Sequence, residues 1–255
     1  MIDPLGALLI IAVGVAAGTV NTIVGAGSLL TFPTLLFLGY PPLVANVSNT
    51  VGLVAGSLSG AIGYRRELAG QRARARPLLI AAALGGLTGG CLLLVLPPSA
   101  FARIVPVLIL VACGLVAIQP RLSAWVLGRR ARSGVVHVGG GWMLVLGVYL
   151  TGIYGGYFGA AQGVILIALL SILVDDDLQR LNGLKNLIAV VINAIAAILF
   201  ILLAPVAWVP AVLLAVGSIV GGQLGAVVGR RLSPLALRAA IITVGTIVAL
   251  RLLLG

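Results

Sequence analysis

Apolar runs long enough to cross a bilayer recur from one end of this chain to the other. A helix needs about 20 mostly apolar residues to span the hydrocarbon core. Only 8% of the 255 residues are charged, against roughly a quarter in a soluble domain. We therefore expect an all-α integral membrane protein in contact with the lipid bilayer. The predicted segments lie near residues 5–25, 28–40, 43–63, 77–96, 101–118, 135–159, 163–174, 182–203, 208–228 and 235–254.

Two of these segments, 28–40 and 163–174, are too short for an upright crossing at a rise of 1.5 Å per residue. Each follows a glycine-rich break, at residues 25–28 and 159–163. A broken helix frees backbone N–H groups, which a bilayer tolerates only inside protein or beside a wet cavity. The paired breaks therefore indicate a functional cavity, and close packing between helices is the alternative role for any single glycine.

The breaks occupy matching places in an internal repeat. The stretch GTVNTIVGAGSLLTFPTLL aligns with YGGYFGAAQGVILIALLSIL, which pairs Gly25 with Gly159. Further on, ANVSNTVGLVAGSLSGAI aligns with NGLKNLIAVVINAIAAIL and pairs Asn49 with Asn186. We expect a first membrane repeat at 1–118, a basic cytoplasmic linker at 119–134 and a second membrane repeat at 135–255.

Basic residues predict how the repeats are oriented. If each break is a single crossing, the 16 Lys and Arg residues show only a weak excess on one side of the membrane. If each break is an out-and-back hairpin, only Arg103 and Arg251 are left on one side, and the opposite side holds Arg65, Arg66, Arg72, Arg74, Arg76, Arg121, Arg129, Arg130, Arg132, Arg180, Lys185, Arg230, Arg231 and Arg238. Since cytoplasmic loops are enriched in Lys and Arg, we favour hairpins, with five segments in each half. The second repeat is then inverted, with the arginine-rich loops cytoplasmic and both termini outside. Inverted repeats are typical of secondary transporters.

The breaks also suggest a binding site for an anion. Helices beginning after Gly27 and near Gly163 would direct free N–H groups and their positive dipole ends at the breaks, and such ends favour anions. Polar residues that open the following apolar segments would supply further donors. The candidate substrate-binding residues are Asn21, Gly25, Gly27, Ser28, Ser48, Asn49, Thr50, Gly159, Gln162, Gly163, Asn182, Lys185 and Asn186.

Lys185 is the most specific of these candidates, because it is the only lysine in the protein. An ammonium group beside the second break would offset the cost of desolvating an anionic substrate. Two alternatives remain open: helix capping for Asn46 or Ser48, and a position at the membrane interface for Lys185 with its ammonium reaching water.

Enzymatic chemistry has no support in the sequence. Cys91 and Cys113 lie in apolar segments without a CxxC motif, and no Ser/His/Asp or two-metal arrangement is visible. The acidic run 175–177 is better explained by loop solvation or helix capping than by proton coupling. The net charge of +11 is explained by membrane orientation without a nucleic-acid partner. We expect no catalytic activity, no cofactor and no metal site.

The two breaks, the proline in FPTLL, the stretches ANVSNT and NGLKN and the two-half organisation together resemble the sulfite exporter TauE/SafE family, also called the 4-toluene sulfonate uptake permeases. The resemblance covers essentially the whole chain. It implies a carrier in the bacterial or archaeal inner membrane that exports sulfite or organosulfonates and is driven by the proton gradient.

Family members often carry a GxGGG-like cluster where this chain has GAGS, and the second break here is GAAQG. Ser28 and Gln162 could therefore adapt the site to another anion. An anion channel, a carrier for a different small oxyanion and a non-transporting membrane partner are the alternatives, and a homodimer is left open.

Overall fold

The computed structural model describes residues 3–133, 141–228 and 234–254. Within these residues the chain is all-helical, as predicted, and forms ten helices joined by short connections. The start of the predicted segment 135–159 and the pair Arg230 and Arg231 lie outside the described residues. The helices are α1 (Pro4–Ile23), α2 (Ser28–Phe37), α3 (Pro42–Gly63), α4 (Arg72–Val95), α5 (Pro98–Ser133), α6 (Gly141–Tyr157), α7 (Gln162–Leu173), α8 (Leu178–Leu203), α9 (Trp208–Val228) and α10 (Pro234–Leu254).

Five helical stretches among the described residues are long and apolar enough to cross a membrane: Pro4–Ile23, Arg72–Val95, Pro98–Arg121, Leu178–Leu203 and Trp208–Val227. Large apolar side chains such as those of Leu202 and Val227 are exposed on the outside of the bundle. In a bilayer such side chains face lipid, because lipid tails are as apolar as they are. The chain is an integral membrane protein.

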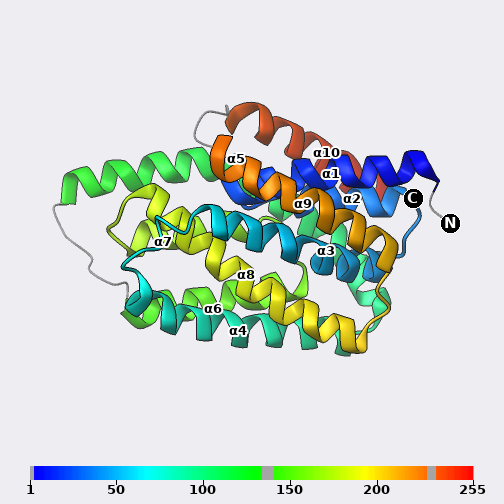
Figure 1. Ribbon diagram of the computed structural model, residues 1–255, viewed down its shortest axis with the longest axis horizontal. Coiled ribbons are helices and arrows are strands. Elements are labelled where there is room, and N and C mark those ends of the chain that lie inside the picture. Colours follow the sequence, from blue (N-terminus) through cyan, green and yellow to red (C-terminus); the bar gives the residue numbers. More distant parts are fainter. Residues whose placement is uncertain (1–2, 134–140, 229–233, 255) are drawn as a thin grey trace.

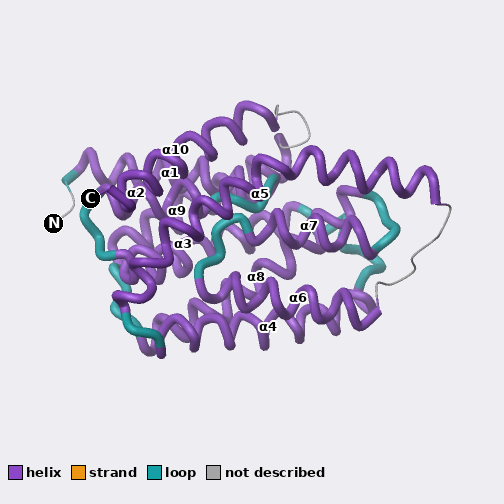
Figure 2. Tube along the Cα trace, turned by 180° about the vertical axis from the view of Figure 1, so that it is seen from behind, coloured by secondary structure: helices purple, strands orange, loops and turns teal. Residues whose placement is uncertain are grey.

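Two short helices turn back on the helices that precede them. Figure 1 shows α2 returning toward the end of the bundle that carries both chain termini, and α7 returning toward the opposite end. Figure 2 shows the same arrangement from behind. The breaks between α1 and α2 and between α6 and α7 therefore reverse the chain inside the bundle.

The main contacts between helices are the same when the first five helices are exchanged for the last five. α1 packs against α9 and α4 packs against α6, while α3 contacts α9 and α8 contacts α4. Replacing α1–α5 by α6–α10 converts each of these contacts into its counterpart, and α3·α8 and α5·α10 convert into themselves.

Glycines allow the closest of these approaches. A Cβ added to Gly18 on α1 would overlap the backbone of Ser218 on α9, and one added to Gly89 on α4 would overlap the backbone of Ile153 on α6. Small residues at such positions let membrane helices approach backbone to backbone.

Three helices run further than the apolar pattern predicts, and one of them, α4, begins at Arg72 instead of residue 77. α5 continues from the predicted segment 101–118 through most of the predicted linker to Ser133, because Leu, Ala and Arg are good helix formers in polar surroundings as well. α8 begins at Leu178, before the predicted start at residue 182, and the Asp177 carboxylate caps it by accepting from Gln179 N at 2.8 Å. The three-part division of the chain stays a prediction.

Candidate functional site

The first break lies between α1 and α2. The N–H groups of Val24 and Gly25 both donate to Val20 O, at 2.7 Å and 3.0 Å. Gly25 has a φ of 86°, the left-handed conformation in which glycine commonly ends a helix. α2 then begins at Ser28, directly after Gly27 as the sequence predicts.

The second break, between α6 and α7, ends in the same way. Phe158 N and Gly159 N both donate to Tyr154 O, at 2.9 Å and 3.0 Å, and Gly159 has a φ of 75°. Ala161, directly before α7, also has a positive φ of 58°. The two breaks therefore end the preceding helix in the same way and differ at the residue before the next helix, since Gly27 has a φ of −60°.

The two breaks touch each other. Gly163 N donates to Gly25 O at 3.1 Å, and a Cβ added to either glycine would overlap the backbone of the other. This contact brings two of the predicted site residues together, from positions far apart in the sequence.

The N-termini of the two short helices differ. Within the described part of the chain, the N–H groups of residues 26–28 at the start of α2 donate no backbone hydrogen bond, and no side chain caps this helix. At the start of α7, Gln162 N donates to Gly159 O at 3.3 Å and Gly163 N is held by Gly25 O. Free N–H groups at a helix N-terminus suit an anion, and the start of α2 leaves more such groups without a backbone partner than the start of α7 does.

Lys185 lies at the carbonyl end of α1. Its Nζ donates to Thr22 O at 3.0 Å and to Asn21 O at 3.4 Å. The side-chain amides of Asn182 and Asn186 also donate to Thr22 O, at 3.5 Å and 3.3 Å. Lys185 is 1% exposed, and it forms no ion pair with a carboxylate of the described residues. The predicted cluster of α8 residues is therefore assembled, inside the protein, at the end of a helix from the other half.

The carbonyl end of α6 has a simpler partner. Asn46 Nδ2, from α3, donates to Tyr157 O at 3.0 Å. Asn46 Oδ1 and the Tyr157 hydroxyl are buried and have no hydrogen-bond partner among the described residues. The end of α1 thus has a lysine and two asparagines as donors, and the end of α6 has one asparagine.

Three predicted site residues have hydrogen bonds of a structural kind. Ser48 Oγ accepts from Ala207 N, in the α8–α9 connection, at 2.8 Å. Thr50 Oγ1 donates to a carbonyl of its own helix, one turn earlier, at 3.0 Å. Asn49 Oδ1 accepts from Thr31 Oγ1 on α2. Of the three, Asn49 holds the short helix α2 against α3.

A chain of polar side chains links the two breaks, and half of it was missed by the sequence analysis. Asn21 Nδ2 donates to Ser57 Oγ at 3.2 Å, Asn193 Nδ2 donates to the same oxygen at 3.4 Å, and Gln162 Nε2 donates to Asn193 Oδ1 at 2.8 Å. Ser57 and Asn193 lie in the second halves of α3 and α8, within apolar stretches. Polar residues inside membrane helices are energetically expensive and commonly functional. Their occurrence there is the signal that could have identified these two residues.

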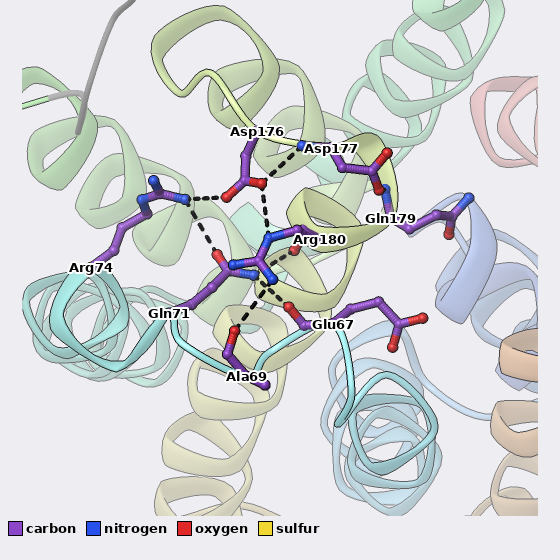
Figure 3. A network of polar contacts seen from close by, with 8 residues as sticks. All are labelled: Glu67, Ala69, Gln71, Arg74, Asp176, Asp177, Gln179 and Arg180. Atoms are coloured by element: carbon purple, nitrogen blue, oxygen red, sulfur yellow. Dashed lines mark hydrogen bonds and ion pairs between the residues drawn. The ribbon is translucent and has the colours of Figure 1, made fainter.

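A polar cluster at the arginine-rich end of the bundle joins the two halves (Figure 3). Asp176 receives Arg74 Nη1 at 2.7 Å and Arg180 Nε at 2.8 Å. Arg180 also donates to Ala69 O at 3.3 Å, and Gln71 Nε2 donates to Arg180 O at 3.1 Å. Burial alone would raise the pKa of Asp176, but the hydrogen bonds and charges of the two arginines outweigh it and hold the pKa below its usual value. The α3–α4 connection is thereby tied to the start of α8.

Metal chemistry gains no candidate from the structure. Among the described residues no three His, Cys, Asp or Glu side chains are grouped closely enough to hold an ion. Cys91 is exposed and Cys113 is buried, and both are free thiols.

Comparisons with known proteins agree with this architecture. The family model described as sulfite exporter TauE/SafE matches residues 10–252. A probable membrane transporter protein of Haemophilus influenzae is 29% identical over 86% of this chain and 83% of its own length. The probable membrane transporter protein YfcA of Escherichia coli K12 is 24% identical over 99% of this chain and 91% of its own length. No solved structure matches the chain.

The match to the family model extends over both breaks, both helices that carry the asparagine clusters and the polar chain between them. These elements form the core of the bundle. The chain belongs to the sulfite exporter TauE/SafE family of membrane transporters.

Proposed function

We propose that this protein is a secondary transporter that exports small sulfur-containing anions, such as sulfite or organosulfonates, and is coupled to the proton gradient. The observation that carries the proposal is the buried ammonium of Lys185, which has no carboxylate partner among the described residues. An unpaired charge in a low-dielectric interior is costly. An anionic substrate would neutralise it.

The anion would bind at the first break. Asn21 connects the two groups that favour it: Lys185 Nζ donates to its carbonyl at 3.4 Å, and a Cβ added to Gly27 would lie 3.0 Å from the Cβ of Asn21. The Nζ of Lys185 and the start of α2 therefore both lie beside Asn21. Several donors at one place can replace the hydration shell of an oxyanion.

The two halves would form inverted repeats that rock around this site, the usual basis of alternating access. The exchange of helix contacts between α1–α5 and α6–α10 supports this arrangement, and so do the hairpins that return to opposite ends of the bundle (Figure 1). We place the arginine-rich loops in the cytoplasm and both termini outside, in the inner membrane of a bacterium or archaeon.

Cysteine labelling tests the orientation. A cysteine at Ala73, in a background without Cys91 and Cys113, should react with a membrane-impermeant thiol reagent only after the membrane is opened. Reaction from the periplasmic side of intact cells would contradict the proposed topology.

Flux into proteoliposomes tests the function. Sulfite, sulfate, thiosulfate, sulfoacetate and taurine are compared with and without a pH gradient. The membrane potential is clamped, because it acts on an anion by about 2.3 kcal/mol per charge per 100 mV. Flux of a sulfur oxyanion that responds to the pH gradient is expected. Flux indifferent to that gradient would contradict proton coupling.

Counterflow separates a carrier from an anion channel. A carrier preloaded with unlabelled substrate accelerates the uptake of labelled substrate, whereas a simple pore does not. We expect accelerated uptake with the unmodified protein. Unaccelerated flux would favour the channel, and absence of flux for every anion would contradict transport itself.

A further inference from the structure

The polar chain between the breaks is buried along most of its length. Gln162, Ser57 and Asn193 are 3%, 6% and 8% exposed. The chain starts at Asn21 near the first break and ends at Gln162, the first residue of α7 after the second break. Its four members come from four helices, two in each half.

Among the described residues, the hydrogen bonds of this chain leave one fully buried side-chain oxygen without a partner. Gln162 Nε2 donates to Asn193 Oδ1, and Asn193 Nδ2 donates to Ser57 Oγ, which also accepts from Asn21 Nδ2. These hydrogen bonds fix the orientation of the Gln162 amide. Its Oε1 is buried and accepts no hydrogen bond from the described residues. Buried amide oxygens in this state are rare and unfavourable.

The unpartnered oxygen lies at the second break. A Cβ added to Gly155 would overlap Gln162 Oε1, and one added to Gly159 would lie 3.9 Å from it. The absence of side chains at these two glycines leaves room for the Gln162 side chain beside the turn that separates α6 from α7. At the first break, the corresponding groups are donors: the N–H groups of residues 26–28, which donate no backbone hydrogen bond, and the Nζ of Lys185, which donates to Thr22 O and Asn21 O. The touching breaks therefore offer donors on one side and an acceptor on the other.

We propose that Gln162 Oε1 accepts a hydrogen bond from the transported anion, so that the protein selects small oxyanions that also carry a donor. Such anions are a monoprotonated oxyanion or a sulfonate with a hydroxyl or amino group. The anionic oxygens would face the first break and the donor the second. Asn193 and Ser57 are positioning residues that hold the Gln162 amide in this orientation. The inference rests on the proposed transport of a small oxyanion and names its substrate class.

A matched pair of ligands tests the inference on the unmodified protein. 2-Hydroxyethanesulfonate and ethanesulfonate differ by one hydroxyl group, and each is used to inhibit counterflow of a labelled sulfur anion in proteoliposomes. We expect the hydroxylated compound to inhibit at a concentration at least about fivefold lower, the scale of one hydrogen bond. Equal inhibition while flux persists would overturn the inference and leave transport intact. Absence of flux for every anion would overturn both.

Variants locate the effect. Gln162→Met keeps the length of the side chain and removes the acceptor, so the two sulfonates should inhibit at equal concentrations. Gln223→Met is the control, because Gln223 bonds Ser59 at 2.7 Å and 3.0 Å between α3 and α9, away from the breaks, and should keep the preference. A preference that survives in Gln162→Met would overturn the inference. If Gln162→Met does not fold, the comparison on the unmodified protein decides.

Discussion

The two breaks share a backbone and differ in what surrounds it. At both, two successive N–H groups donate to one carbonyl and a glycine with positive φ reverses the chain. The carbonyl end of α1 meets Lys185 and two asparagines, whereas that of α6 meets the single amide of Asn46. The helix before each break ends in the same way, and only the end of α1 has a lysine as a hydrogen-bond donor.

This difference bears on the role of the lysine. A cation near a helix C-terminus is stabilising, so Lys185 could serve only to hold the end of α1. The end of α6, however, is built with one neutral amide in its place. A broken helix in this fold therefore does not need a cation at its carbonyl end, which favours a ligand as the reason for the lysine.

The comparison predicts that Gly25 is more sensitive to substitution than Gly159, the glycine with which it is paired in the second break. Gly25→Ala should lower the free energy of unfolding by about 2–5 kcal/mol, since the methyl group adds backbone strain and overlaps Gly163. Gly159→Ala should cost about 1–3 kcal/mol, because its Cβ would meet one carbonyl oxygen, Gly155 O, at 2.9 Å. Thermal unfolding in detergent measures both.

Gly39→Ala is the control for backbone strain alone. Gly39 has the same φ of 86° as Gly25 and has nothing within 4 Å of an added Cβ. A loss of about 1–2 kcal/mol is expected. If Gly25→Ala is no worse than Gly39→Ala, the two breaks do not touch as described.

A second prediction concerns the lysine. Lys185→Met keeps the length and removes the charge, so apparent substrate affinity should fall roughly tenfold or more, the scale of a charge-assisted hydrogen bond of about 1.5–3 kcal/mol. Lys185→Arg should recover part of the loss. Asn46→Leu, at the other break, is the matched variant and should change affinity less. Titration of initial flux against substrate concentration gives these values.

The opposite result would reverse the assignment. If Lys185→Met transports with unchanged affinity, while substitutions of Asn49 or Asn186 abolish binding, the site is built from neutral donors. The lysine would then stabilise only the end of α1.

The smallest expected effect lies at the arginine-rich end, outside both breaks. Asp176→Asn should lower stability by about 1–2 kcal/mol at neutral pH, because Arg74 and Arg180 lose their charged partner. The pKa of Asp176 is lowered in the folded protein. Its contribution is therefore present above the pKa of an unfolded Asp, about 3.9, and is lost as pH falls through the folded value. Unfolding curves of the two proteins should converge below about pH 4, and a constant difference down to pH 3 would contradict this.

The sequence predicted the helices well where hydrophobicity decides them. The breaks, α2 and α7 were found because glycines interrupt apolar runs, and their contact places Gly25 against Gly163. The end of α5 was missed, since its last turns are polar and the prediction followed apolar runs alone.

The candidate site was predicted less completely. Asn182, Lys185 and Asn186 lie within two turns of α8, so their clustering could be expected. Their common acceptor, Thr22 O, is a backbone atom on α1, and no side-chain type in the sequence identifies such a partner. Ser57 and Asn193 were missed because each lies further along its helix than the polar cluster that opens the apolar segment. Only the folded bundle brings them together.

Protection of one cysteine tests the central claim, that the anion binds at the first break. Ser28→Cys, at the start of α2, is made in a background without Cys91 and Cys113 that still transports. Ser171→Cys, near the far end of α7 and partly buried like residue 28, is its matched control. A transported organosulfonate should slow thiol labelling at residue 28 in a concentration-dependent way and leave labelling at residue 171 unchanged. Labelling at residue 28 that proceeds at the same rate with saturating substrate, in a protein with normal flux, would contradict binding at the first break.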